Sequence, residues 1–149
     1  MNYLALTGLT TSIVAFLGAG FVFLKNPRKK LFIIFVLANL VLSLWGFGLF
    51  KGFTTTNAET ALFWGRVLNL SAIFIGMFIF HFECVLSNVE KEKKKEIFVY
   101  YLISIIYFTI ALLFPATFIK SVEPTGIFLF YPKAGFLYYF FPVWYFYLF

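Results

Sequence analysis

Four of the few polar side chains in a long apolar run are the residues through which this chain could do chemistry. Within Leu62 to Leu86 these are Arg66, Asn69, His81 and Glu83. A histidine and a carboxylate can pass a proton between them when they touch. At 100° per residue, however, His81 lies roughly opposite Glu83 on one straight helix, so we expect no dyad between them.

The same projection places Asn69 and Glu83 on one face, within about 40° of three small residues. An ionisable side chain at the bilayer centre costs about 2.5 to 3.5 kcal/mol and usually marks an interior contact or a function. We therefore predict an interior face, on which Glu83 has either a structural or interfacial role or a proton- or signal-coupled role. The small residues of this face are Gly65, Ala72 and Gly76.

Arg66 and His81 lie away from that face, near opposite ends of the run, and we predict interfacial positions for both. The long Arg66 side chain can extend its charge toward the membrane surface. For His81 we favour a hydrogen bond to a loop or neighbouring helix, because a lone histidine lacks partners for catalysis or metal binding. Cys84 could add a second metal ligand, but two ligands are too few for a site.

Most familiar catalytic signatures are missing from the sequence. It contains no aspartate, no glycine-rich phosphate loop, and no HExxH or GxSxG motif. These absences exclude paired-aspartate catalysis and aspartate-based magnesium sites within these residues. We expect that this chain is not an enzyme, and we predict no catalytic, cofactor-binding or metal-binding residues.

The composition indicates that these residues are positioned by helices in a membrane. Apolar residues make up 62% of the 149 residues, aromatic residues 24% and charged residues 12%, and the mean hydropathy is +0.94. A soluble domain of this size could not bury so much apolar surface. About 20 apolar residues cross a bilayer core, and four runs reach that length. We predict an all-α integral membrane protein with four full spans and a partial fifth, at about 4–24, 31–50, 62–86, 97–118 and 135–149.

A second polar face is predicted within the run 31–50. Asn39, Ser43 and Gly46 follow one another at i, i+4 and i+7, so they share one side of a helix. An amide directed at lipid would leave its hydrogen-bonding groups unsatisfied. We therefore predict that Asn39 and Ser43 are interior and pack against a neighbouring helix.

The positive charges are concentrated in two predicted loops. The net charge is +6, and eight of the twelve lysines and arginines lie in 25–30 and 91–95. Cytoplasmic loops of membrane proteins carry the positive excess. We therefore predict that these two loops are inside and the N-terminus outside, and we expect no nucleic-acid partner.

Two segments allow more than one interpretation. The predicted outer loop 119–134 is either a short β-hairpin that caps the outer end of the bundle, which its flanking turn residues favour, or an interfacial strip. The run 136–149 contains ten aromatic residues among fourteen and no charge. We interpret 135–149 as a partial fifth span or a re-entrant segment, and 1–149 as one membrane domain of a truncated chain.

The order of these features resembles the N-terminal seven-helix membrane region of bacterial histidine kinases and related signalling proteins. The resemblance covers the whole chain but only the first four to five helices of that unit. It implies an outside N-terminus, and a kinase or cyclic-dinucleotide-synthesising output domain after the seventh helix. The matching pieces are Asn26-Pro27, Phe32 through Trp45, Ala61 through Arg66, Phe80-His81-Phe82, Gly126, Gly135 and Leu137 through Phe140.

Our first hypothesis is a sensory input region in the bacterial plasma membrane, whose helix packing biases a cytoplasmic output. The expected partners are the lipid bilayer, an output domain or partner protein, and, as an open alternative, a second copy of the chain. A second hypothesis is a small transporter or channel-like protein, with Asn39, Asn69 and Glu83 lining a polar path. A membrane enzyme or accessory subunit ranks last, because no catalytic cluster is present.

Overall fold

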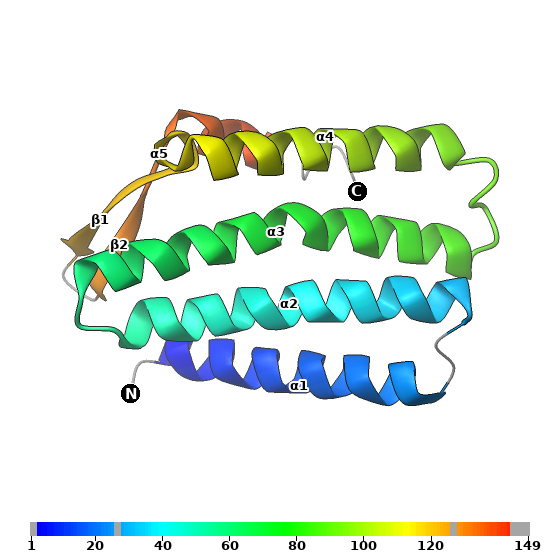
Figure 1. Ribbon diagram of the computed structural model, residues 1–149, viewed down its shortest axis with the longest axis horizontal. Helices are drawn as coiled ribbons and strands as arrows, with labels where there is room; N and C mark the ends of the chain where they lie inside the picture. The colour runs from blue at the N-terminus through cyan, green and yellow to red at the C-terminus, as the bar shows by residue number, and fades with distance from the viewer. Residues whose placement is uncertain (1–2, 26–27, 126–127, 144–149) are drawn as a thin grey trace.

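Four long helices follow one another in an antiparallel arrangement and lie side by side in chain order (Figure 1). The structure is a computed structural model that describes residues 3–25, 28–125 and 128–143. All four helices are long enough and apolar enough to cross a membrane, which confirms the four predicted long apolar helices. They are α1 (Tyr3–Lys25), α2 (Lys30–Thr54), α3 (Ala58–Leu86) and α4 (Lys94–Leu113).

Two helix ends show how the sequence sets the boundaries. At the start of α3 the Asn57 side chain accepts a hydrogen bond of 3.0 Å from the backbone N–H of Thr60, which satisfies one free donor of the first turn. The predicted helix 97–118 is divided at Phe114, because Pro115 disfavours a helical conformation in the residue before it. The short helix α5 (Pro115–Phe118) follows this break.

The predicted hairpin is present, so the fold is mostly helical and not all-α. Strands β1 (Ile119–Thr125) and β2 (Phe128–Ala134) pair antiparallel. The hairpin lies at the end of the bundle where α2 passes into α3 (Figure 1). A Cβ placed on Gly65 of α3 would lie 3.5 Å from the Pro132 ring, so this strand packs directly on the helix.

The predicted partial fifth span is not a long helix in the part that the structure describes. The 3-10 helix η1 (Phe136–Phe140) follows the hairpin and leads into one further helical turn at 141–143. Residues 144–149 lie outside the described residues. Leu137, Tyr138 and Phe141 pack against a buried cluster formed by Ile73, Ala111, Phe118 and Ile119. This segment therefore serves as a cover over α3 and the hairpin base.

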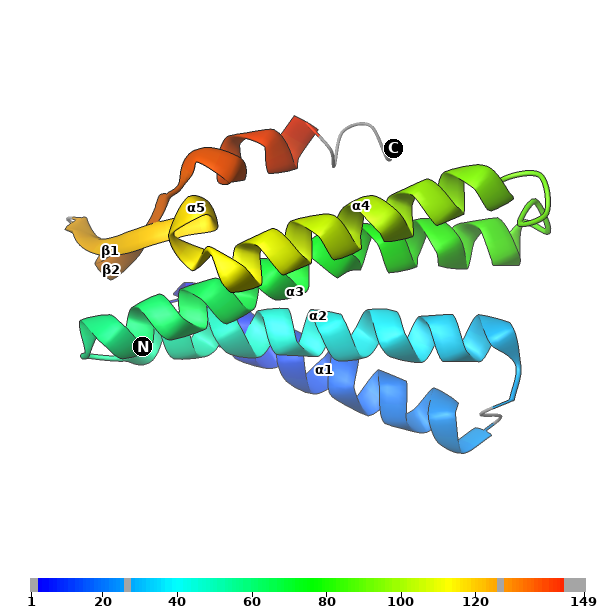
Figure 2. The same cartoon turned by 45° about the horizontal axis from the view of Figure 1, so that its top comes forward.

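Helices α1 and α2 approach each other through small residues. Ser43 Oγ donates a hydrogen bond of 2.9 Å to the backbone carbonyl of Ser12, and the two Oγ atoms lie 3.2 Å apart. Small side chains let helix backbones come close in lipid, where burial of apolar surface gives no driving force. The two helices cross at an angle and separate toward Lys25 (Figure 2). The buried face of α1 consists of Ala5, Gly8, Ser12, Ala15 and Ala19.

The buried stripe of α3 winds around the helix and does not run straight along it. Each step of four residues turns about 40° beyond a full turn, so the stripe turns by about 160° between Gly65 and His81. The cause is that α3 contacts α2 on one side, as in the Phe35–Phe82 ring pair, and α4 on another, as in the Phe78–Tyr101 pair. The stripe is Ala61, Gly65, Asn69, Ile73, Met77 and His81.

Candidate functional site: a polar junction at the lysine-rich end

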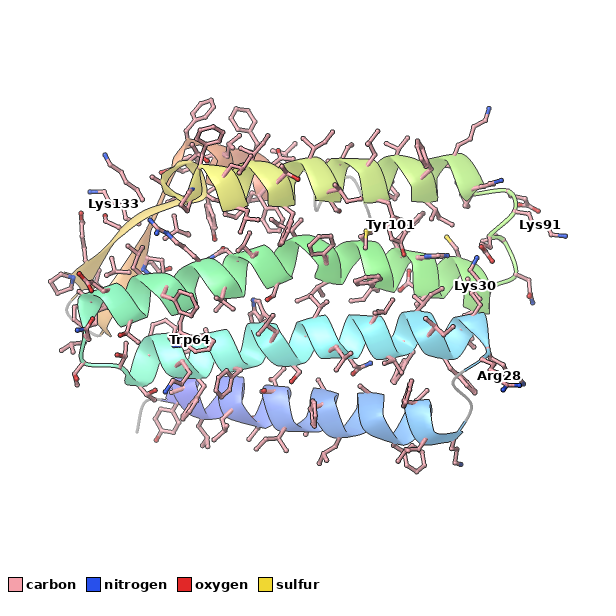
Figure 3. All side chains as sticks on the ribbon, viewed as in Figure 1. Arg28, Lys30, Trp64, Lys91, Tyr101 and Lys133 are labelled. Atoms are coloured by element: carbon pink, nitrogen blue, oxygen red, sulfur yellow. The ribbon has the colours of Figure 1, made fainter. Side chains whose placement is uncertain are left out.

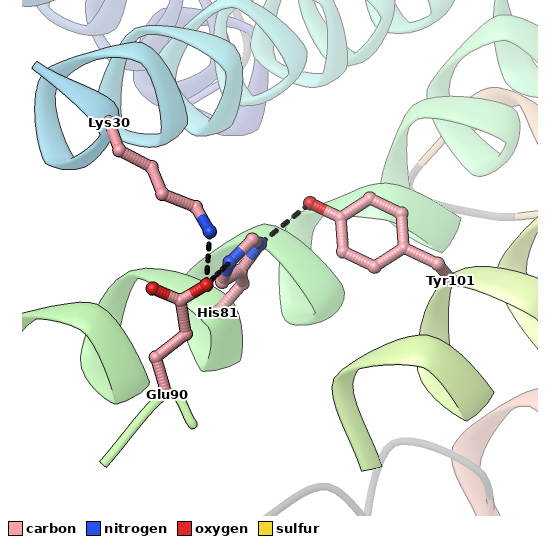
Figure 4. Close-up of polar contacts among 4 residues, drawn as sticks. All are labelled: Lys30, His81, Glu90 and Tyr101. Atoms are coloured by element: carbon pink, nitrogen blue, oxygen red, sulfur yellow. Dashed lines mark hydrogen bonds and ion pairs between the residues drawn. The ribbon is translucent and has the colours of Figure 1, made fainter. Parts of the chain in front are cut away.

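The turns from α1 to α2 and from α3 to α4 lie at the same end of the bundle, opposite the hairpin (Figure 1). Arg28, Lys30 and Lys91 extend from this end, and Lys133 from the other (Figure 3). Here four polar side chains from different elements meet, and we name this group the lysine-end junction. It consists of Lys30 of α2, His81 of α3, Glu90 of the following turn and Tyr101 of α4 (Figure 4).

His81 is the centre of the lysine-end junction. Its residue surface is only 9% exposed, and its Nδ1 shares a hydrogen bond of 2.9 Å with the Tyr101 hydroxyl. The two rings meet edge to face, with centroids 5.6 Å apart. Nε2 lies 3.7 Å from a Glu90 carboxylate oxygen, which is an ion-pair distance but too long for a hydrogen bond. His81 therefore connects α3 to α4 and faces the turn between them.

The backbone of the α3–α4 turn directs Glu90 back toward His81. Asn88 has φ 59, in the left-handed region that asparagine tolerates better than most residues. The Val89 N–H donates to the Cys84 carbonyl at 3.0 Å and the Asn88 N–H to the Val85 carbonyl at 3.3 Å. These two bonds form the Schellman pattern that ends a helix. This reversal places Glu90 next to the last turns of α3.

Glu90 also forms an ion pair with Lys30, which brings α2 into the same group. The hydrogen bond from the Lys30 ammonium lowers the pKa of the Glu90 carboxyl below its ordinary value of 4.5. Both side chains are partly exposed, 56% for Lys30 and 33% for Glu90, so water weakens their attraction. The pair therefore positions the turn more than it stabilises the fold.

A pH dependence follows from the lowered pKa of Glu90. A carboxyl with a depressed folded-state pKa stabilises the folded protein above its unfolded pKa, and this contribution is lost as the pH falls through the folded pKa. We expect the Lys30–Glu90 contribution, about 1 kcal/mol or less, to disappear below pH 4.5. Thermal melts of the wild type and Glu90→Gln between neutral and acidic pH should converge at low pH. Parallel curves at all pH values would contradict the assignment.

The hydrogen bond between His81 and Tyr101 gives a prediction for stability. His81→Phe leaves the Tyr101 hydroxyl without its partner, and Tyr101→Phe removes that hydroxyl while the ring contact stays. Polar contacts between membrane helices measured in this way average about 0.6 kcal/mol and reach about 1.7. We expect a coupling in this range from a double-mutant cycle of unfolding free energies in detergent. Additive single effects would show that the two groups do not interact.

The predicted interior residues of α2 and α3 are placed as follows. Ser43, Asn69 and Gly76 are buried, as predicted, and Asn39 is half-buried. The Asn39 side-chain amide donates to the Phe35 carbonyl at 2.9 Å, and that of Asn69 to the Gly65 carbonyl at 2.8 Å. Each amide thus bonds within its own helix, whereas Ser43 bonds to a neighbouring helix.

Glu83 corrects the prediction of an interior ionisable group, because its side chain is exposed on the surface of α3. On a straight helix Glu83 shares the direction of Gly65, and that alignment led to the interior assignment. The winding of the buried stripe turns the interior side away from this direction before the helix reaches Glu83. His81 takes the buried position at this end. His81 and Glu83 therefore lie on different sides of the helix, as predicted, but His81 is the buried residue and Glu83 the exposed one.

Arg66 and His81, the two residues predicted to be interfacial, are both partly or fully enclosed by the protein. Arg66 is half-buried, and its guanidinium donates to the Ile119 carbonyl at 3.4 Å, a long contact that connects α3 to the start of the hairpin. Its Nε is buried without a hydrogen-bond partner among the described residues. His81 is buried and forms the predicted kind of bond, to a neighbouring helix. Its partner is the hydroxyl of Tyr101.

Sequence reasoning did not identify Lys30, Glu90 or Tyr101 as site residues. Lys30 and Glu90 belong to charged loops that the positive-inside rule explains without a partner. Tyr101 is one of nine tyrosines, so its residue type carried little information. The available signal was Asn88, a residue suited to reversing the chain immediately before a glutamate.

Within residues 3–25, 28–125 and 128–143, no three histidine, cysteine or acidic side chains gather as metal ligands. The lysine-end junction contains one carboxylate, one imidazole, one phenol and one ammonium group. These groups can connect the helices through hydrogen bonds and ion pairs. No protein-family model, curated protein or solved structure matches the chain. The functional argument therefore depends on the residues and their geometry.

Proposed function

We propose that the chain is the transmembrane sensory input region of a bacterial signal-transduction protein of the histidine kinase type. It would lie in the plasma membrane with its N-terminus outside and relay a stimulus to a cytoplasmic output domain. The observation that carries the proposal is the lysine-end junction. It connects α2, α3, α4 and the α3–α4 turn through polar contacts at the end predicted to face the cytoplasm.

The junction is suited to a relay because its contacts differ in strength. Along their lengths α3 and α4 meet through aromatic rings, such as Phe74 with Phe108, which can slide past one another, and through one long hydrogen bond of 3.5 Å from Ser104 Oγ to the Ile73 carbonyl. At the lysine-rich end they meet through a directional hydrogen bond and a partly exposed ion pair. A small movement of α4 would break the hydrogen bond and leave the ion pair. The relay that we propose requires two packings of similar free energy that differ in this way.

The transporter alternative receives less support from the described residues. The side-chain amides of Asn39 and Asn69 each bond to a carbonyl of their own helix, and Glu83 is exposed on the outside of α3. These three groups therefore line no shared polar path within the part of the chain that the structure describes. A conducting path would require helices to separate where their small residues bring them together.

The coding sequence downstream of Phe149 and the activity of its product test the function. We expect two more apolar spans and then a kinase or cyclic-dinucleotide-synthesising domain. In membrane vesicles containing the whole gene product, His81→Gln should change the output activity, whereas Lys91→Gln, at an exposed position in the α3–α4 turn, should not. A stop codon directly after Phe149, or equal output from both variants and the wild type, would overturn the proposal.

The proposed orientation has its own test. Reporter fusions after Asn57, between α2 and α3, should report the outer side, and fusions after Asn88, between α3 and α4, the cytoplasmic side. The expectation rests on the lysines and arginines at 25–30 and 91–95, which favour the cytoplasm. The reverse pattern would place the lysine-end junction outside and remove it from contact with any cytoplasmic output.

A further inference from the structure

A cavity of about 320 Å³ lies beneath the hairpin, at the opposite end of the bundle from the lysine-end junction. This volume is at the small end of the range of about 300 to 1,000 Å³ that ligand pockets occupy. Its walls come from both helices of the central pair, both strands and η1, so it exists only because the hairpin folds back on the bundle. The lining residues include Leu49, Phe53, Asn69, Ile119, Pro132 and Tyr138.

The lining is apolar apart from a few uncharged polar groups. Asn69 is 7% exposed, and its Nδ2 donates to Gly65, which leaves Oδ1 without a hydrogen-bond partner among the described residues. Oδ1 is not fully buried, so it remains accessible to a ligand. Tyr131 and Tyr138 also line the cavity, and no lysine, arginine or acidic residue of the described chain does.

This lining selects the chemistry of an occupant. A charged ligand would lose its hydration with no opposite charge in the wall, which is costly. A purely apolar ligand would leave the Asn69 carbonyl oxygen unpaired. By contrast, the cavity of about 280 Å³ between α1 and α2 is lined by apolar residues and glycine, including Phe16, Gly20 and Leu40, and opens where the helices separate. The described residues that line it offer no polar side chain, so it suits a lipid chain.

We propose that the cavity beneath the hairpin is a binding site for a small neutral amphiphile, an alcohol or phenol with an apolar body. The ligand hydroxyl donates to Asn69 Oδ1, and the apolar body lies against Phe53, Pro132 and Tyr138. The role of this cavity as the stimulus site of a sensor rests on the proposed function, whereas the binding itself does not. Asn69 and His81 lie on the same helix, roughly 18 Å apart at 1.5 Å per residue, so α3 connects the two ends.

Photolabelling of the full chain in lipid nanodiscs tests the site, with a diazirine derivative of octan-1-ol as the probe. We expect labelled residues in α3 and in 128–143, and competition by octan-1-ol but not by octanoate. Ala134→Phe, which fills the cavity, should abolish this labelling. Asn69→Leu, which keeps the side chain near its size, should weaken binding about tenfold, the equivalent of one lost hydrogen bond.

The matched control is Gly20→Phe, which fills the cavity between α1 and α2, because a Cβ at Gly20 meets no atom within 4 Å. This variant should leave labelling beneath the hairpin unchanged. Labelling spread over the exposed faces of α1, and insensitive to Ala134→Phe and Asn69→Leu, would show partition into lipid only and overturn the site. Specific labelling without any change in output from the whole gene product would retain the site and reject the sensory function.

Discussion

Replacing Gly46 with leucine is expected to separate α1 from α2 and to lower the free energy of unfolding by about 3 kcal/mol, the upper end of the usual range for an overpacked contact. A Cβ at Gly46 would lie 2.7 Å from the Gly8 carbonyl oxygen and 2.8 Å from the Ser12 backbone nitrogen. Both are backbone atoms, which cannot turn away as a flexible side chain could. The helices must therefore move apart along the crossing that their small residues create.

The thermal unfolding midpoint in detergent measures this loss, and Gly20→Leu provides its control. The control adds the same side chain to a helix of the same pair, at a position where a Cβ meets nothing within 4 Å. The separation itself can be followed by a disulfide between cysteines at positions 12 and 43, whose serine Oγ atoms lie 3.2 Å apart. With Cys84 changed to serine, this disulfide should form readily in the parent and slowly in Gly46→Leu. Equal midpoints for the two leucine variants would contradict the close approach.

The helices and the hairpin could be predicted because local chemistry determines them. Each of the four longest apolar runs forms a helix long enough to cross a membrane, whatever its neighbours are. Asn57 begins α3 through its own side chain, and Pro115 ends α4 through the geometry of its ring. The hairpin depended on turn residues at both of its ends. None of these features required knowledge of which helices touch.

The direction of burial along α3 could not be predicted in the same way. A projection at 100° per residue assumes one interior direction for the whole helix, and it correctly placed Asn69 and Gly76 inside. At the far end the buried side of α3 faces Tyr101 of α4, while α2 contacts the adjoining side at Phe82, so His81 is enclosed and Glu83 is exposed. Only the positions of the neighbouring helices determine where this change occurs.

The lysine-end junction shows the same limitation for the candidate site. His81 was recognised as unusual, but its partners lie elsewhere in the chain. Tyr101 belongs to a different helix, 20 residues further on, and Glu90 belongs to the turn, 9 residues further on. A single sequence contains the left-handed preference of Asn88 but not the side on which the turn closes. The partners therefore follow from the tertiary arrangement.

Replacing Gly135 with alanine is expected to displace the hairpin from α5 and to remove the cavity beneath it. An added Cβ would overlap the Thr117 carbonyl oxygen and lie 2.5 Å from that of Ala116, closer than any real contact. The Gly135 N–H donates to the Phe118 carbonyl at 2.8 Å, so the backbone cannot move away without breaking this bond. We expect a loss of about 3 kcal/mol of local stability, because both the packing and the hydrogen bond are affected.

Hydrogen–deuterium exchange of the backbone in 119–143 measures this displacement, and Gly52→Ala is its control. Gly52 lies at the same end of the bundle, where an added Cβ meets no atom within 4 Å, so this variant should exchange like the wild type. Faster exchange in Gly135→Ala should be confined to the hairpin and η1, while α1 and α2 keep their protection, because Ser12 and Ser43 join them independently of the hairpin. Uniformly faster exchange in all helices would instead show that the hairpin supports the whole bundle. Unchanged exchange at 119–143 would show that Gly135 does not hold it.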